Sequence, residues 1–135
     1  MLFRSGDYAF YGCSGLTDFH IPDSVTKIGD YAFSQCGISE ISIPARAELG
    51  ESVFKSCRNL QKVTLPIRMS ELPADLFADC ISLSGIDFPE GLTCIGAGVF
   101  YGCEGLVSIR FTGTHHQGET DTQKVKEVFH MLSVL

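Results

Sequence analysis

The chain has 135 residues, of which 44% are hydrophobic and 19% charged, enough apolar material for the core of one domain and too much for a disordered chain. A formal net charge of −6 argues against a phosphate-neutralising surface, so nucleic acid is not an expected partner. No apolar run reaches the roughly 18 residues of a membrane span, so membrane insertion is not expected either.

The element Phe-x-x-Cys recurs along the chain at intervals of 23, 21, 23 and 23 residues. An apolar-x-apolar pair follows each Cys, and a proline directly follows four of these five pairs. A fixed period of this length is typical of repeat proteins, in which each repeat forms one coil and buries its apolar side only by stacking on its neighbours. The five occurrences are Phe10/Cys13, Phe33/Cys36, Phe54/Cys57, Phe77/Cys80 and Phe100/Cys103.

The first complete repeat predicts the course of one coil. Residues 16–21 end in an alternating apolar pattern, as a half-buried main strand should, and Pro22 ends the strand by removing a ladder donor. Residues 24–29 read as a second short strand that closes in a glycine turn. Asp30 then caps a helical turn that places the Phe and the Cys, three residues apart, on the inner side.

This frame resembles the BspA-like subclass of leucine-rich repeat proteins, over about residues 1–112. The motifs that carry the resemblance are Ile21-Pro22, Ile28-Gly29, Ala32-Phe33 and Cys36 in one coil, and Ile95-Gly96, Val99-Phe100, Gly102-Cys103 and Leu106 in another. The resemblance implies an α/β leucine-rich repeat solenoid of about five stacked 21–23-residue coils, each made of parallel β-strand plus a short helical turn. It also implies a cell-surface or secreted protein that adheres to a protein ligand such as a host extracellular protein.

The chain begins in the middle of a repeat, because residues 6–10 match residues 29–33. We therefore expect a fragment of a longer protein, whose open N-terminal coil invites self-association.

The six cysteines are expected to be free thiols. In-register stacking would hold neighbouring Cβ atoms about 4.8 Å apart, beyond the range of a disulfide. The sequence therefore predicts a buried structural column of thiols at Cys13, Cys36, Cys57, Cys80 and Cys103. Cys94 aligns with the outward Lys27 and is expected to be exposed. No cofactor is expected, and no metal either, because the thiols point inward in single file and the histidines do not converge on them. These histidines are His20, His115, His116 and His130.

After the repeats, residues 113–119 read as a polar linker and residues 120–135 as an amphipathic helix. Apolar residues recur in it at helical spacing, at Val125, Val128, Phe129, Leu132 and Leu135. Two roles stay open for this helix: it caps the last coil, or it is an assembly element that contacts a second chain.

No nucleophile, base and stabilising donor converge in the sequence, so we expect no enzyme. The leading hypothesis is a protein-binding surface on the outward positions of the stacked main strands. One column of this face holds Asp18, Glu40, Lys62, Gly85 and Ser108, and the other His20, Ser42, Thr64, Asp87 and Arg110. The alternative is that these coils are a structural spacer in a longer array. The tyrosines Tyr8, Tyr31 and Tyr101 are expected to cover the helical-turn side.

Overall fold

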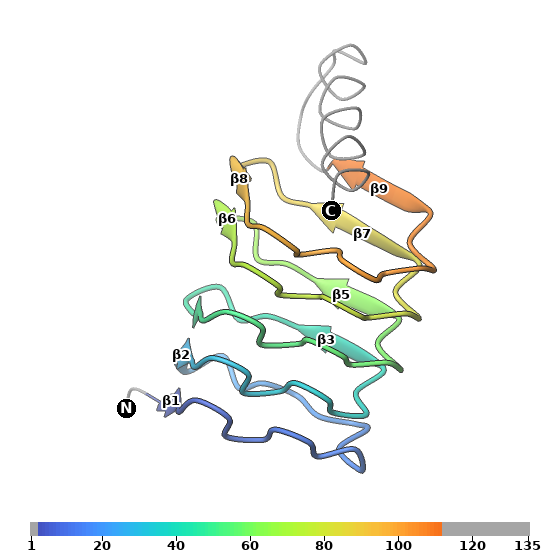
Figure 1. Ribbon diagram of the computed structural model, residues 1–135. Helices are drawn as coiled ribbons and strands as arrows, with labels where there is room; N and C mark the ends of the chain where they lie inside the picture. Colours follow the sequence, from blue (N-terminus) through green and yellow to red (C-terminus); the bar gives the residue numbers. More distant parts are fainter. Residues whose placement is uncertain (1–2, 112–135) are drawn as a thin grey trace.

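Short parallel strands build the protein, which we describe from a computed structural model over residues 3–111 (Figure 1). The strands in this range are β1 (Phe3–Ser5), β2 (Val25–Ile28), β3 (Glu40–Ser42), β4 (Glu48–Leu49), β5 (Lys62–Thr64), β6 (Glu71–Leu72), β7 (Gly85–Phe88), β8 (Cys94–Ile95) and β9 (Ser108–Phe111). The described residues contain no helix, and so none that could cross a membrane.

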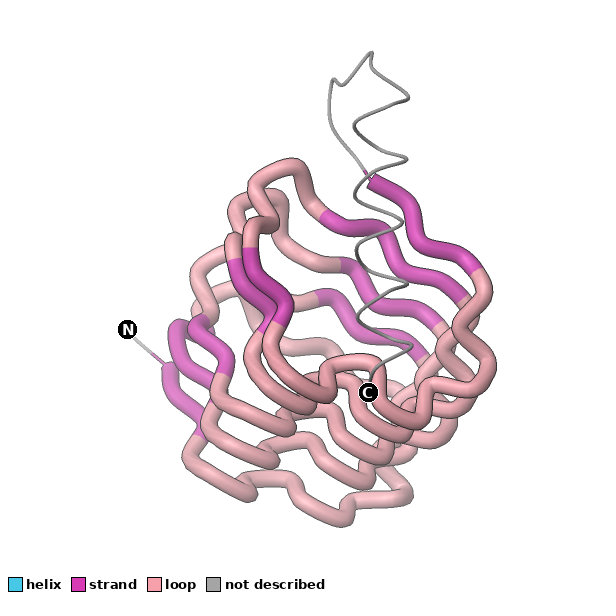
Figure 2. The backbone as a smooth tube through the Cα atoms, turned by 45° about the horizontal axis from the view of Figure 1, so that its top comes forward, coloured by secondary structure: helices cyan, strands magenta, loops and turns pink. Residues whose placement is uncertain are grey.

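The chain winds into stacked coils with three sides, and we number the coils 1 to 5 by their phenylalanines, from Phe10 to Phe100. The main strands β3, β5, β7 and β9 form one side and the strands β1, β2, β4, β6 and β8 a second (Figures 1 and 2). The Phe-x-x-Cys segments form the third side, which we call the turn side. The register of the paired main strands is regular, since Ile41 lies opposite Val63 and Ile86 opposite Ile109. The period-2 alternation therefore points the same repeat position inward in successive coils.

The predicted helical turns are wrong, because the turn side consists of stacked turns. In coil 2 the backbone is left-handed at Tyr31 and Gln35, with φ of 59° and 61°. Every coil has two such residues four apart: Tyr8 and Gly12, Tyr31 and Gln35, Ser52 and Ser56, Asp75 and Asp79, Gly98 and Gly102. Left-handed residues break a right-handed helix, so residue spacing alone misleads here.

Successive backbone amides on the turn side donate alternately to a carbonyl of the next coil and to a carbonyl of their own coil. In coil 2 the amide of Phe33 donates to the carbonyl of Val53 in the next coil, whereas that of Ser34 donates to Tyr31 in its own coil. Asp30 does not cap its own coil: its Oδ1 accepts the amide of Glu51, 2.9 Å away in coil 3. Half of the donors that a helix would use internally therefore join neighbouring coils.

Two other expectations concern the ends of the chain. The predicted main strand at residues 16–21 is wrong, although Ile21 is buried. This segment belongs to the first described coil, and it forms no ladder hydrogen bonds with β3. The predicted linker 113–119 and helix 120–135, with the histidines and apolar residues in them, lie outside the described residues.

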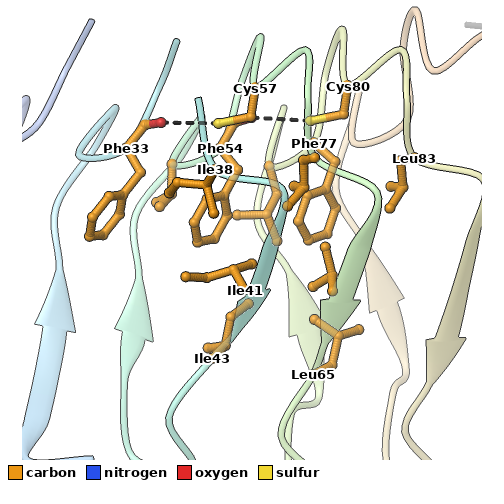
Figure 3. Close-up of a cluster of buried hydrophobic side chains, with 14 of the residues drawn as sticks. Phe33, Ile38, Ile41, Ile43, Phe54, Cys57, Leu65, Phe77, Cys80 and Leu83 are labelled. Atoms are coloured by element: carbon orange, nitrogen blue, oxygen red, sulfur yellow. Dashed lines mark hydrogen bonds between the residues drawn. The ribbon is translucent and has the colours of Figure 1, made fainter. Parts of the chain in front are cut away.

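A stack of phenylalanine rings runs through the core beneath the turn side (Figure 3). Consecutive ring centroids are 5.1, 5.8, 5.9 and 6.2 Å apart from Phe10 to Phe100, with interplanar angles of 9° to 19°. Phe54 and Phe77 in the middle of the stack are completely buried. The rings thus carry the contact from coil to coil along the whole described stack.

The strand ladders are interrupted between coils 3 and 4. Among the described strands β4 pairs with β2 alone and β6 with β8 alone, and β5 and β7 lie side by side without pairing. Glycine amides bridge the other junctions, as when Gly50 donates to Ile28 and Gly96 to Leu72, both at 2.8 Å. Pro73 stands at this position in coil 4 and has no amide hydrogen, so the bond from coil 4 to Leu49 cannot form.

Candidate functional site

The outer face of the main strands brings most of the predicted site residues into register. Glu40 lies opposite Lys62 and Ser42 opposite Thr64 in the β3–β5 pair. In the β7–β9 pair, Gly85 lies opposite Ser108 and Asp87 opposite Arg110. Asp18 and His20 are outside any strand, but they line a hollow of about 200 Å³ together with β3 and β5. All ten positions of the two predicted columns therefore lie on one continuous face, which we call the strand face.

The larger hollow on this face is a groove of about 570 Å³ between β5 and β7, which extends to β9. Lys62, Thr64, Asp87 and Arg110 line it. The guanidinium Nε of Arg110 lies 3.9 Å from Oδ1 of Asp87, and both side chains are exposed. An exposed ion pair at this distance contributes little to stability, so its two charges remain available to a partner.

Two apolar residues that sequence reasoning missed border this groove. Ile67 follows β5 and Val107 precedes β9, with exposed fractions of 80% and 79%. The signal was present in the repeat alignment, because both stand where other coils carry small or polar residues. Val107 corresponds to Thr17, Ser39, Gln61 and Ser84, and Ile67 to Asp23, Ala45 and Glu90. Exposed apolar side chains beside separated charges are typical of a surface that binds another protein.

The buried cysteines are held by the phenylalanine carbonyls of the preceding coils. The thiol of Cys57 donates to the carbonyl oxygen of Phe33 at 3.1 Å, and that of Cys80 to Phe54 at 3.2 Å (Figure 3). Cys36 and the partly buried Cys103 make the same contact. The prediction that Cys13 is buried is wrong: Cys13 is exposed, because it lies in the first described coil and no described coil before it supplies a phenylalanine carbonyl. The column thus links successive coils through hydrogen bonds, and all six cysteines are free.

The buried thiols are poor nucleophiles and poor metal ligands. Burial raises the pKa of Cys57 to about 12 and that of Cys36 and Cys103 to about 11, so these groups stay protonated at neutral pH. Among residues 3–111, no three His, Cys, Asp or Glu side chains gather as metal ligands would.

Thiol accessibility gives a direct check of this arrangement. We expect iodoacetamide at pH 7.5 to modify the exposed Cys13 and Cys94 in the folded protein, and to reach Cys57 and Cys80 only after denaturation. Peptide mass spectrometry after timed labelling measures the rates. A Cys94→Ser variant should lose one fast site, and equal rates for Cys57 and Cys94 would contradict the buried column.

Comparisons with known proteins agree with this geometry. The family model of BspA type leucine rich repeat regions matches residues 4–121 in six copies. The solved structure of a leucine-rich repeat protein from Bacteroides ovatus is 33% identical with a TM-score of 0.77, and the match covers 80% of this chain. A leucine rich cell surface protein from Faecalibacterium prausnitzii is 29% identical with a TM-score of 0.63 over 78% of this chain. A search of curated proteins found no match.

The matched structures are mostly longer. This chain spans 28% of the B. ovatus protein and 35% of the F. prausnitzii protein. It spans 76% of a leucine-rich repeat protein from T. pallidum, which at 23% identity and a TM-score of 0.71 shows the fold alone.

Proposed function

Because this chain belongs to the BspA-type leucine-rich repeat family, we propose that it is a non-enzymatic module that binds another protein through the strand face. The observation that carries the proposal is the groove between β5 and β7, where the exposed Ile67 and Val107 flank Lys62, Asp87 and Arg110. Leucine-rich repeat proteins generally mediate contacts between proteins, and stacked strands leave their outward positions free for recognition. Arginine with apolar neighbours is a common core of such interfaces.

We further propose that the parent protein is secreted or displayed at the cell surface and that the module adheres to an extracellular protein. The likeness to a leucine rich cell surface protein supports the location. The mixed charges of the strand face, with Asp18 and Glu40 on coils 1 and 2 and Arg110 on coil 5, favour a polar, charged partner.

The chain can be tested by immobilising it and measuring binding to a panel of purified extracellular matrix proteins. For any protein that binds, an Ile67→Ser/Val107→Ser/Arg110→Ser variant is expected to weaken binding by tenfold or more, since about 2 kcal/mol is typical of interface hot spots. Ile81→Ser is the matched control, because Ile81 is an exposed apolar residue outside the groove. Binding that survives the triple substitution would remove the strand face as the site.

The second candidate is a structural spacer in a longer array, favoured by the unbroken turn-side ladder that joins all five coils. In this role the first coil would stack on another copy or on further repeats, and the predicted helix at 120–135 would provide a second route to self-association. Failure of every protein in the panel to bind, with concentration-dependent self-association in light scattering, would favour this candidate.

A further inference from the structure

Three tyrosines form an ordered, exposed patch on the turn side of coils 1 and 2. The rings of Tyr8 and Tyr31 stack at 4.9 Å with an interplanar angle of 5°. Tyr11 meets Tyr8 edge-on at 5.3 Å, and its hydroxyl accepts a 2.8 Å hydrogen bond from the side-chain amide of Gln35. Tyr8 and Tyr11 are nevertheless 54% and 43% exposed. The tyrosine patch (Tyr8, Tyr11 and Tyr31) therefore presents fixed aromatic surface to solvent.

The fold does not require tyrosine at these positions. Tyr8 and Tyr31 occupy the first left-handed position of their coils, with φ of 60° and 59°. Small or short side chains hold the same position in the other coils: Ser52, Asp75 and Gly98. A bulky side chain at positive φ is uncommon. Structural need alone thus does not account for two tyrosines here.

Acidic residues are the chain neighbours of the patch. The residues before the left-handed position in coils 1 to 3 are Asp7, Asp30 and Glu51. Asp7 and Asp30 each use one oxygen, Oδ1, to accept the backbone amide of the next coil, which fixes their charge beside the rings. Two basic side chains, Lys55 and Arg58, also lie in this stretch of coil 3, and Asp75 and Asp79 extend the acidic surface to coil 4. The strand face, in contrast, carries nearly balanced charges.

We propose that the tyrosine patch is a docking site for a basic polypeptide segment, with an arginine side chain packing against the exposed parts of Tyr8 and Tyr11. A guanidinium group is planar, so it can stack on an aromatic ring while its N–H groups donate to a carboxylate. One arginine can therefore contact a tyrosine ring and a neighbouring acidic side chain at the same time. Tyrosine and acidic side chains in one place provide both kinds of contact. This site lies on a different side of the coils from the strand face, and it does not depend on the function proposed for that face.

The chain suits a fluorescence test, because it has no tryptophan and three of its four tyrosines belong to the patch. Titration with a hexa-arginine peptide is expected to change tyrosine emission with saturation, and hexa-lysine to bind about three- to fivefold more weakly, as a missing stacked guanidinium predicts. Tyr8→Ser, the residue found at this position in coil 3, should remove the preference for arginine. Tyr8→Phe keeps the ring and should keep it.

Variants that neutralise acidic side chains distinguish binding at the tyrosine patch from a general attraction of the basic peptide to the negatively charged protein. Asp7→Asn/Asp30→Asn/Glu51→Gln keeps the side-chain oxygens that accept backbone amides and should weaken hexa-arginine binding about three- to tenfold. Asp18→Asn/Glu40→Gln/Asp87→Asn removes the same charge from the strand face and should have little effect, as should Tyr101→Ser. Equal weakening by the two triple variants, equal affinity for the two peptides, or unchanged binding by Tyr8→Ser would overturn the proposal.

Discussion

A Phe54→Ala variant is expected to lose about 3–5 kcal/mol of the free energy of unfolding, the usual cost of truncating a buried phenylalanine. Phe54 is completely buried and stacks on both sides, 5.8 Å from the ring of Phe33 and 5.9 Å from that of Phe77. Because small domains are stable by only about 5–15 kcal/mol, this one change should remove a large part of the total. Urea unfolding followed by circular dichroism measures it as a lower midpoint.

The control for this variant is Tyr101→Ala, which deletes an aromatic ring that is 54% exposed in coil 5. Substitution of an exposed residue away from special features changes stability by about 0.5 kcal/mol or less. A Phe54→Ala protein that unfolds at the same urea concentration as Tyr101→Ala would show that the ring stack does not hold the coils together.

The stacking of the coils follows from the sequence, whereas the conformation of the turn side does not. A fixed period places Phe33, Phe54 and Phe77 at one repeat position, and identical positions must superpose when coils stack. The spacing of Phe33 and Cys36 fits a helical turn and a pair of tight turns equally well. The helical turn and the tight turns differ in the amides that donate to the next coil, such as that of Phe33 to Val53. These residues are 20 apart, so a pattern over a few neighbouring residues cannot predict this hydrogen bond.

The strand face was accessible to sequence reasoning only in part. Alternation along each strand predicts which side chains point outward, so Glu40, Lys62 and Arg110 could be placed on one face. The groove depends on a missing ladder between β5 and β7, which no single strand reveals. Pro73 is the residue in the sequence that indicates a break in the ladders between coils 3 and 4, because it replaces the glycine whose amide donates in coils 2, 3 and 5.

Alkaline pH is expected to destabilise the protein through its buried thiols. Burial raises the pKa of Cys57 from its ordinary value of 9.0 to about 12, and those of Cys36 and Cys103 to about 11. The pKa of Cys80 is raised further by the same cause. Above pH 9 the unfolded chain therefore releases protons that the folded chain keeps. Since the unfolded state then binds fewer protons, the free energy of unfolding falls as pH rises, and this contribution is intact below pH 9.

The size of this effect makes it measurable by thermal unfolding between pH 7 and pH 11. Each thiol that is ionised only in the unfolded state lowers the free energy of unfolding by about 1.4 kcal/mol per pH unit, so several thiols together should give a steep fall in the melting temperature. Tyrosine and lysine also titrate in this range, so the comparison is with Cys57→Ala/Cys80→Ala, which lacks the two thiols that are completely buried. This variant should be less stable at pH 7 because it loses packing and two hydrogen bonds to Phe33 and Phe54. Its melting temperature should nevertheless decline less steeply above pH 9. Parallel declines for the two proteins would mean that the thiol column is not what makes the fold sensitive to alkali.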